Sequence, residues 1–266
     1  MTDHPPVRYD VTDAVATITL DRPEAHNALD LFTKEALRDA VRQAAEDEAV
    51  RCVLLTGAGE KAFCAGQDLR EHAANLAEKS PEEVWSTVPA HYIPIALGLA
   101  TMPKPVVAAV NGVAAGAGAA LAFACDFRVV ADTAGFNLAF AGIGLTCDTG
   151  TSWTLPRLVG HARAVDLLMR PRTISAREAA DVGLATSVVP LDSLATEAAA
   201  LARELAAGPT AAYAAIRLSL SYAANHTLEE SLAFEGEMMR LTGDTDDHRA
   251  AVAAFQAKKR PTFHGH

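Results

Sequence analysis

The stretch that decides the fold runs from Asn111 to Asp126 and reads Asn-Gly-Val-Ala-Ala-Gly-Ala-Gly-Ala-Ala-Leu-Ala-Phe-Ala-Cys-Asp. It follows the β-branched run 105–110, so the pattern predicts a buried strand, a tight turn at Asn111-Gly112, and a buried helix opened by Gly116 and Gly118. Small residues at a helix start cost helix stability or packing area, which indicates that a partner approaches the backbone closely. A helix start also presents unpaired N–H groups and the positive end of the helix dipole. We therefore expect an electrophilic pocket in which backbone N–H groups favour a partial negative charge on the ligand.

A second turn of the same character occurs earlier in the chain. It reads Phe63-Cys-Ala-Gly-Gln-Asp-Leu69 and follows a buried strand expected at Cys52–Leu55, and Asp68 can cap the next helix. With the amphipathic helix expected from Asn27 to Glu46, the order is β-α-β, which predicts a parallel sheet with a right-handed crossover. Open sheets of this kind bind ligands at their carboxyl edge. One backbone N–H group from each turn could therefore converge on a single oxygen.

The rest of the chain divides into an α/β core, residues 1–190, and a C-terminal helical region, residues 191–266. Further strands are expected at 7–9, 15–20, 105–110, 127–130 and 136–140, and further helices at 151–159, 161–169, 175–182, 194–205, 210–224, 228–241 and 246–259. Ser175 with Glu178 fits a capping box. Segment 71–101 mixes charged helical sequence with prolines, which is typical of lids and pocket walls.

The composition excludes several classes of protein. The 266 residues carry a formal net charge of −10, and the pI near 5.3 argues against a nucleic-acid partner, which needs a basic surface. The four cysteines lack CxxC spacing and have no nearby pair of histidines, so we expect a reduced, cytoplasmic protein without a disulfide framework or a metal site. The polar start Met-Thr-Asp-His-Pro-Pro does not resemble a signal peptide. The longest apolar run, 113–124, is shorter than the roughly 20 residues that a bilayer requires, so no membrane partner is expected.

Glycine-rich phosphate-binding motifs are absent from the sequence. A G-x-G-x-x-G motif that begins at Gly116 would need a third glycine where the chain has Leu121, and no Walker pattern occurs. A dinucleotide-binding module is therefore the least favoured function. A plain helix-packing role for the small residues remains an alternative for this stretch.

Several motifs together resemble those of the crotonase, or enoyl-CoA hydratase/isomerase, superfamily. They are Arg22-Pro-Glu-Ala-His-Asn-Ala-Leu29, Ala62-Phe-Cys-Ala-Gly-Gln-Asp-Leu69, Lys104-Pro105, Asn111-Gly112, Gly116-Ala-Gly118, Cys125-Asp126, Leu155-Pro-Arg-Leu-Val-Gly160 and Phe255-Gln-Ala-Lys-Lys-Arg-Pro-Thr-Phe263. The resemblance covers nearly the full chain. It implies an α/β fold, a crotonase-like spiral of ββα units, with a C-terminal helical region that mediates trimerisation.

The resemblance also implies a site and a ligand. Members bind acyl-CoA thioesters without a further cofactor, and the N–H groups that match Ala65 and Ala117 form an oxyanion hole for the thioester oxygen. The positions that match the CoA and substrate site are Ala25, Ala65, Gly66, Gln67, Asp68, Leu69, Gly116, Ala117 and Lys258. Because the family usually assembles as trimers or dimers of trimers, a homotrimer or hexamer is expected, with Lys258 near a subunit contact.

One departure from the family pattern bears on the reaction. Family hydratases use two glutamates, and the matching positions here are Ala120 and Phe140, neither of which transfers a proton. One carboxylate, Asp148, matches the acid/base aspartate of dienoyl-CoA isomerases and of the phenylacetate-pathway branch that isomerises ring epoxides. The run 111–118 with Asp148-x-Gly-x-x-Trp153 looks most like that second branch. We therefore expect an acyl-CoA isomerase in which Asp148 shuttles the proton, with its pKa raised by apolar neighbours.

Alternative interpretations remain open for these residues. Asp148 could merely cap the helix that begins near Thr149. A hydratase, hydrolase or lyase could use another acid, such as Glu71, and Tyr92 or Asn137 could touch the acyl group. With both family glutamates missing, the chain could also be a catalytically silent CoA-ester binder.

Overall fold

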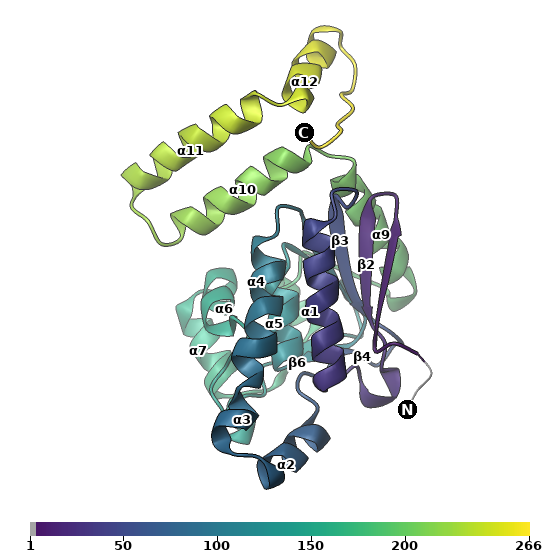
Figure 1. Ribbon diagram of the computed structural model, residues 1–266, viewed down its shortest axis with the longest axis vertical. Helices are drawn as coiled ribbons and strands as arrows, with labels where there is room; N and C mark the ends of the chain where they lie inside the picture. The colour runs from purple at the N-terminus through teal and green to yellow at the C-terminus, as the bar shows by residue number, and fades with distance from the viewer. Residues whose placement is uncertain (1–3) are drawn as a thin grey trace.

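The computed structural model describes residues 4–266, and the chain forms two sheets surrounded by helices, with a helical arm that extends from the core (Figure 1). The first three residues of the predicted polar start lie outside the described part. The larger sheet has the order β1 (Val7–Thr12), β2 (Val15–Leu20), β3 (Cys52–Gly57), β5 (Val106–Val110), β7 (Phe127–Ala131) and β10 (Ser187–Val189). The smaller sheet has the order β4 (Ala62–Cys64), β6 (Val113–Ala115), β8 (Gly135–Asn137) and β9 (Thr173–Ser175).

The chain alternates between the two sheets, and this alternation produces the spiral. The pairs β3–β4, β5–β6 and β7–β8 each place one strand in the larger sheet and the next in the smaller sheet before the chain becomes helical. Neighbouring strands from β2 through β3, β5 and β7 are parallel, and so are β4, β6 and β8. The predicted fold class, a spiral of ββα units with C-terminal helices, is confirmed.

The smaller sheet was not expected from the sequence. The helix predicted directly after the turn at Asn111-Gly112 is instead preceded by the short strand β6. Asn111 holds this junction, because its side-chain amide donates to the carbonyl oxygens of Gly59 and Ala62 while its Oδ1 accepts from the N–H of Gly57. The hydrogen bonds of this side chain thus connect the end of β5 to the segment that joins β3 to β4.

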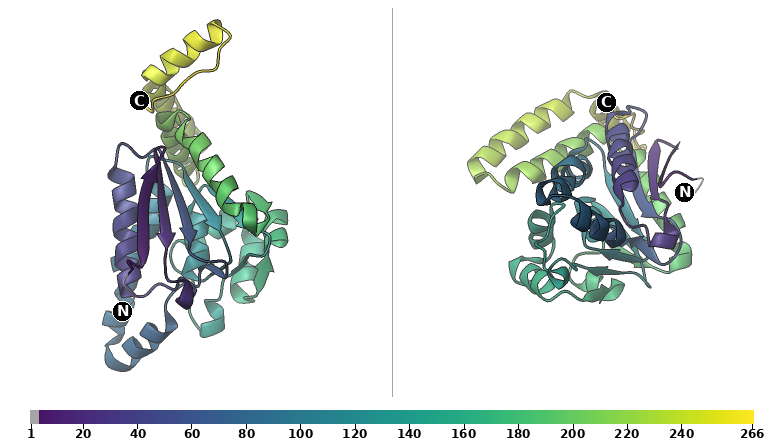
Figure 2. Two further views of the ribbon diagram at one scale, coloured as in Figure 1. Left: turned by 90° about the vertical axis from the view of Figure 1, so that its right-hand side faces the viewer. Right: turned by 60° about the horizontal axis from the view of Figure 1, so that its bottom comes forward.

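Helices cover both faces of the larger sheet. Figure 2 shows α1 (Leu31–Glu46) on one face and α9 (Leu191–Ala206) on the other. Asp30 caps α1 by accepting the N–H of Thr33 at 2.9 Å, so the helix begins four residues later than the predicted Asn27, and Leu37 in this helix is fully buried.

The remaining helices of the core surround the smaller sheet. After β4 come α2 (Leu69–Glu78), α3 (Pro81–Trp85), a π-helical turn (Val88–Tyr92) and α4 (Ile93–Thr101), so the segment that the sequence left unassigned is helical almost throughout. After β6 comes α5 (Ala117–Ala124), which is buried along its whole length. The others are short 3₁₀ helices at Pro23–Ala25 and Ala141–Ile143, then α6 (Thr151–Val159), α7 (His161–Met169) and α8 (Ala176–Asp181).

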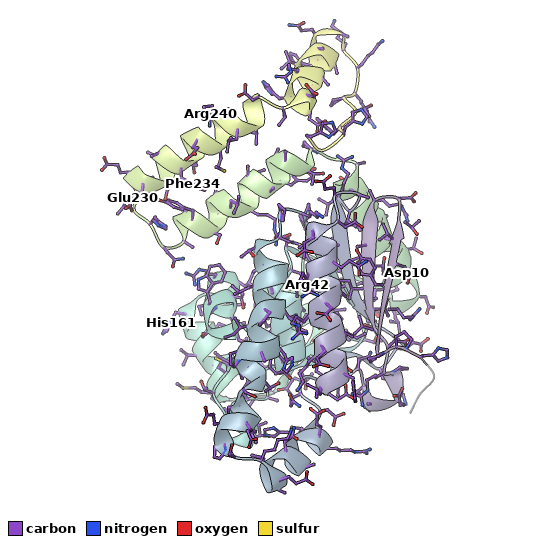
Figure 3. All side chains as sticks on the ribbon, in the orientation of Figure 1. Asp10, Arg42, His161, Glu230, Phe234 and Arg240 are labelled. Carbon is purple, nitrogen blue, oxygen red and sulfur yellow. The ribbon has the colours of Figure 1, made fainter. Side chains whose placement is uncertain are left out.

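The last three helices form the arm, which consists of α10 (Thr210–Ala223), α11 (Leu228–Gly243) and α12 (Asp246–Gln256). Phe234 of α11 stacks on Tyr222 of α10, with their ring centroids 4.2 Å apart (Figure 3). Arg217 fixes α10 to the core, because its guanidinium pairs with Asp126 at 2.9 Å and donates to the carbonyl of Leu99 at 2.7 Å. The arm and the core are therefore joined by a partly buried ion pair.

The arm carries apolar side chains that no residue of the same chain covers within the described range 4–266. They include Leu220, Leu228, Met239 and Phe255, each at least 70% exposed. The role of residues 191–266 in oligomerisation, and their division from the core at residue 190, stay predictions. Among residues 4–266 there is no helix whose length and apolar character would allow it to cross a membrane.

Substituting Gly118 with alanine should destabilise the fold. An added Cβ would lie 2.1 Å from the carbonyl oxygen of Cys64, so two backbone segments would have to move apart. Overpacking of this kind costs about 1–3 kcal/mol, and we expect a loss of that size in the free energy of unfolding measured in urea at fixed protein concentration.

Gly236→Ala provides the matched control. Gly236 lies inside α11, and an added Cβ would meet no atom of the described residues within 4 Å. Alanine favours a helix over glycine by up to about 1 kcal/mol, so this variant should be as stable as the original chain or more stable. Equal stability of the Gly118→Ala variant and the original chain would contradict the close approach at Cys64.

Candidate functional site

The two glycine-containing turns touch each other at one end of α5. Gly66 has a φ of +83°, and an added Cβ would lie 2.7 Å from the carbonyl oxygen of Ala115 and 3.3 Å from the nitrogen of Ala117. At Gly118 the approach is closer still, because an added Cβ would lie 2.1 Å from the carbonyl oxygen of Cys64. Glycine is required at both positions because a side chain would separate the segments. The predicted meeting of the two turns is therefore present.

One of the two N–H groups predicted to be unpaired at this junction is already hydrogen-bonded in the structure. The N–H of Ala65 already donates to the carbonyl oxygen of His26 at 3.1 Å, so Ala65 cannot be the free oxyanion donor that the resemblance implied. The N–H of Gln67 is the remaining candidate donor on this turn. Neither it nor the N–H of Ala117 donates a hydrogen bond among the residues that the structure describes.

The parallel bridge between Leu29 and Gln67 explains why the N–H of Gln67 is left without an acceptor. The N–H of Leu29 donates to the carbonyl of Gly66, and the N–H of Asp68 donates to the carbonyl of Leu29. In a parallel bridge the residue between two bonded neighbours directs its own N–H and C=O to the opposite side. The Gln67 N–H therefore points away from Leu29.

A cavity of about 630 Å³ opens beside the junction. Its lining includes Ala65, Gly66, Gln67, Leu69, Gly116, Ala117 and Asp148 from the predicted site, together with Trp85, Val88, Tyr92, Ile93, Phe140, Ile143 and Cys147. Most of the wall is thus apolar or aromatic. Tyr92, considered as a substrate contact from the sequence, does line the cavity, whereas Asn137 is not part of the lining and instead donates to Thr173 Oγ1.

Three of the predicted binding residues lie outside this lining. Ala25 ends a 3₁₀ helix, and Asp68 caps α2 by accepting from the N–H groups of Arg70 and Glu71. Lys258 follows α12 on the arm, at the opposite end of the molecule from α2 and α3 (Figure 1). A single chain therefore does not bring Lys258 to the cavity, and the CoA contacts of these three residues stay predictions.

Asp148 supplies a carboxylate to the cavity wall. Burial raises its pKa above the usual range, while a hydrogen bond from Thr149 Oγ1 at 2.8 Å opposes that rise. The alternative that its side chain caps α6 is wrong, because Gly150 is the capping residue and only the backbone carbonyl of Asp148 accepts from the N–H of Thr151. The carboxylate oxygen atoms of Asp148 therefore make no capping hydrogen bond to α6.

The sequence did not identify Thr149 as a functional residue. Its side chain is buried, and its φ of +53° is unusual for a β-branched residue, which indicates local strain of about 1–3 kcal/mol. This conformation places the hydroxyl against Asp148. A positive φ at threonine leaves no signal in the sequence, so only the structure could reveal the contact.

The positions that carry glutamates in family hydratases are both apolar here. Ala120 is fully buried in α5, and Phe140 lines the cavity. Glu71, the alternative acid, does not line the cavity: it pairs with Lys34 at 3.3 Å and accepts the N–H of Leu31 at 2.7 Å. Nowhere in residues 4–266 do three His, Cys, Asp or Glu side chains group closely enough to hold a metal ion.

The chain is similar to known proteins along almost its whole length. A family model described as enoyl-CoA hydratase/isomerase matches residues 10–266. The chain is 41% identical to the 1,2-epoxyphenylacetyl-CoA isomerase of Escherichia coli (strain K12) over 255 residues, which cover 96% of this chain and 97% of that protein. It is 35% identical to the crotonyl-CoA hydratase of Syntrophomonas wolfei over 262 residues, which cover 94% and 95%. The crystal structure of a proposed enoyl-CoA hydratase/isomerase from Mycobacterium abscessus has a TM-score of 0.94 at 42% identity, covering 98% of this chain and 100% of that one.

Removing the Thr149 hydroxyl should raise the pKa of Asp148. Thr149→Val keeps the shape of the side chain but deletes the donor that favours the charged carboxylate. The carboxyl carbon of Asp148, followed by ¹³C NMR in protein labelled at aspartate, should titrate at higher pH in this variant.

Thr149→Ser is the control for that titration, because serine retains the hydroxyl and should titrate close to the original chain. The signal is assigned by its loss in Asp148→Asn. A pKa that is unchanged or lower in Thr149→Val would contradict the role of this hydrogen bond.

Proposed function

The chain belongs to the enoyl-CoA hydratase/isomerase family, and we propose that within it this protein is an acyl-CoA isomerase that moves a proton with Asp148. One observation carries the proposal: among the described residues that line the cavity, Asp148 is the one carboxylate and is half-buried, while the positions of both hydratase glutamates hold Ala120 and Phe140. Water addition needs one group to activate water and another to protonate carbon. Isomerisation needs only one base that returns the proton it removes.

The backbone junction supplies the electrophilic half of the reaction. The thioester oxygen accepts hydrogen bonds from the N–H groups of Gln67 and Ala117, which have no acceptor among residues 4–266. Negative charge develops on this oxygen when the proton beside the carbonyl leaves, and each donor in such a hole contributes about 2.7–4 kcal/mol to stabilising the transition state. The dipole at the start of α5 acts in the same direction.

Asp148 supplies the proton-transfer half. Its carboxylate removes the proton from the carbon next to the thioester, which gives an enolate held by the two N–H groups. The protonated carboxyl then returns the proton two carbons away, which shifts the double bond. On a ring epoxide, the enolate instead forms a C=C bond to the ring carbon as the C–O bond of the epoxide breaks, and the carboxyl gives its proton to the released oxygen. A pKa raised by burial makes Asp148 a stronger base than a solvated carboxylate.

The substrate we propose is an acyl-CoA with an apolar acyl group, and no further cofactor. The aromatic wall formed by Trp85, Tyr92 and Phe140 suits a flat or cyclic acyl group. The similarity to the ring-epoxide isomerase of Escherichia coli favours the same class of substrate.

A hydratase is the second candidate, because a crotonyl-CoA hydratase is 35% identical to this chain. It would require an acid other than Asp148. Glu71 is poorly suited because Lys34 and the N–H of Leu31 already occupy its two oxygen atoms. A silent CoA-ester binder would use the same cavity without proton transfer.

We further propose that the protein is cytoplasmic and forms a homotrimer or a dimer of trimers through the apolar faces of α10 to α12. A neighbouring subunit could then bring Lys258 to the CoA portion of the ligand. The exposed side chains of Met239 and Phe255 support an interface on the arm, since side chains of this size are seldom left isolated in water in such number.

Asp148→Asn should abolish proton exchange without abolishing binding. In deuterated water, the original chain should introduce deuterium next to the thioester across a panel of enoyl-, dienoyl- and ring-epoxide-CoA esters. Asparagine keeps the shape of the side chain but cannot act as a base, so exchange should fall by at least about 100-fold. Mass spectrometry of the recovered esters measures the loss.

Asp10→Asn is the matched control, because Asp10 is exposed on β1 and does not line the cavity. Exchange that survives in Asp148→Asn would remove Asp148 as the base. Binding of CoA esters by the original chain with no exchange on any ester would favour the silent binder, and rapid hydration of crotonyl-CoA would favour the hydratase.

The assembly can be measured separately. Light scattering should give a mass three or six times the 27.9 kDa of the chain. Met239→Glu places a charge on the arm and should lower that mass, whereas Met169→Glu on α7, equally exposed at 73%, should not. A monomer for the original chain at micromolar concentration would overturn the proposed assembly.

A further inference from the structure

Lys34 of α1 is a buried lysine that the proposed mechanism does not use. Its side chain is only 3% exposed, and its Nζ lies 3.2 Å from Gln67 Oε1, 3.3 Å from Glu71 Oε1 and 3.0 Å from Thr87 Oγ1. These three acceptors match the three N–H bonds of the ammonium group. Because burying an ammonium ion costs several kcal/mol before pairing, its presence needs a structural or functional reason.

The bonds of Lys34 converge on the residue that supplies one oxyanion donor. Gln67 Oε1 accepts from Lys34 and also from the hydroxyl of Tyr92 at 2.6 Å, while Gln67 Nε2 donates to Glu71 Oε1 at 3.3 Å. The side-chain amide of Gln67 is therefore occupied within the protein. Since the side chain is held at both ends, the peptide N–H of Gln67 is held in place with it.

The same ammonium group reaches the wall of the acyl cavity. Thr87 directly precedes the π-helical turn and Tyr92 is its last residue, and Val88 and Tyr92 line the cavity. Thr87 Oγ1 is also 3.1 Å from His91 Nδ1, and the Lys34 Nζ lies 5.8 Å from the centre of the Tyr92 ring. Lys34 thus joins three segments: α1, the turn before α2, and the helical wall of residues 87–92.

We propose that Lys34 is a positioning residue for the oxyanion hole. It fixes the Gln67 N–H against the thioester oxygen and links that donor to the wall that contacts the acyl group. The inference rests on the proposed oxyanion hole, although it does not depend on Asp148. If Lys34 were only structural, its loss would lower the stability of the fold and nothing else. In the proposed role, its loss also weakens the polarisation of the thioester carbonyl.

Lys34→Met tests the proposal, because methionine has a similar length and no charge. The probe is cinnamoyl-CoA, whose absorption moves to longer wavelength when hydrogen bonds at the carbonyl oxygen stabilise its charge-separated excited state. We expect the bound probe to show a smaller red shift in Lys34→Met than in the original chain. In the deuterium-exchange assay kcat should fall on the order of 10-fold to 100-fold with little change in KM, since misplaced donors act mainly in the transition state.

Lys104→Met is the matched control. Lys104 is another buried lysine, 6% exposed, whose Nζ donates to the carbonyl oxygens of Ala44 and Asp47, and it does not line the cavity. This variant should lower the melting temperature while leaving the red shift of the bound probe unchanged. If Lys34→Met does not fold, Lys34→Gln, whose neutral side chain is shorter than that of lysine, should reduce the red shift in the same way.

The outcomes distinguish a failure of the proposed role of Lys34 from a failure of the proposed oxyanion hole. A reduced red shift in Lys34→Met, with the original shift in Lys104→Met, supports the positioning role. A full red shift and full kcat in folded Lys34→Met, or in Lys34→Gln where Lys34→Met does not fold, overturn it while leaving the oxyanion hole in place. Absence of any red shift when the original chain binds the probe overturns the oxyanion hole and the positioning role together.

Discussion

The close contact between two backbone turns is the constraint on which the rest of the structure depends. Gly118 lies against the carbonyl of Cys64, and Gly66 lies against Ala115 and Ala117, so neither turn can carry a side chain at the point of contact. The smaller sheet holds these turns together, because β4 and β6 are neighbouring parallel strands that lead directly into them. Without that pairing, two peptide N–H groups from distant parts of the sequence would not reach the same cavity.

Sequence patterns predicted the helices and strands that are long enough to show a periodic arrangement of apolar residues. The five- and six-residue strands of the larger sheet and the helices from α6 to α12 have enough residues to show periodicity, and the bounds of α6 and α7 match the prediction. The four strands described in the smaller sheet have three residues each and no visible period, so β4, β6 and β9 were missed, and so was the three-residue strand β10 of the larger sheet. Their pairing comes from tertiary contacts that a local pattern does not encode.

The candidate site was predictable in its location and less so in its details. Asp148 and the two turns were identified, and the structure places them around one cavity. Ala65 was predicted as a free donor although its N–H is bonded to His26, because residue spacing does not reveal which N–H groups are already paired. The proposed roles of Thr149 and Lys34 rest on a backbone angle and on buried hydrogen bonds, and the linear sequence shows neither.

The use of peptide groups as donors also affects how this protein can change over time. Every amino acid except proline carries the same N–H, so almost any substitution at Ala117 would preserve the donor atom, provided the side chain can be accommodated. The side chains around the cavity are then free to vary while the electrophilic group persists. Mutational drift in such a pocket would more readily alter which acyl groups enter, and where protons move, than whether a thioester is activated.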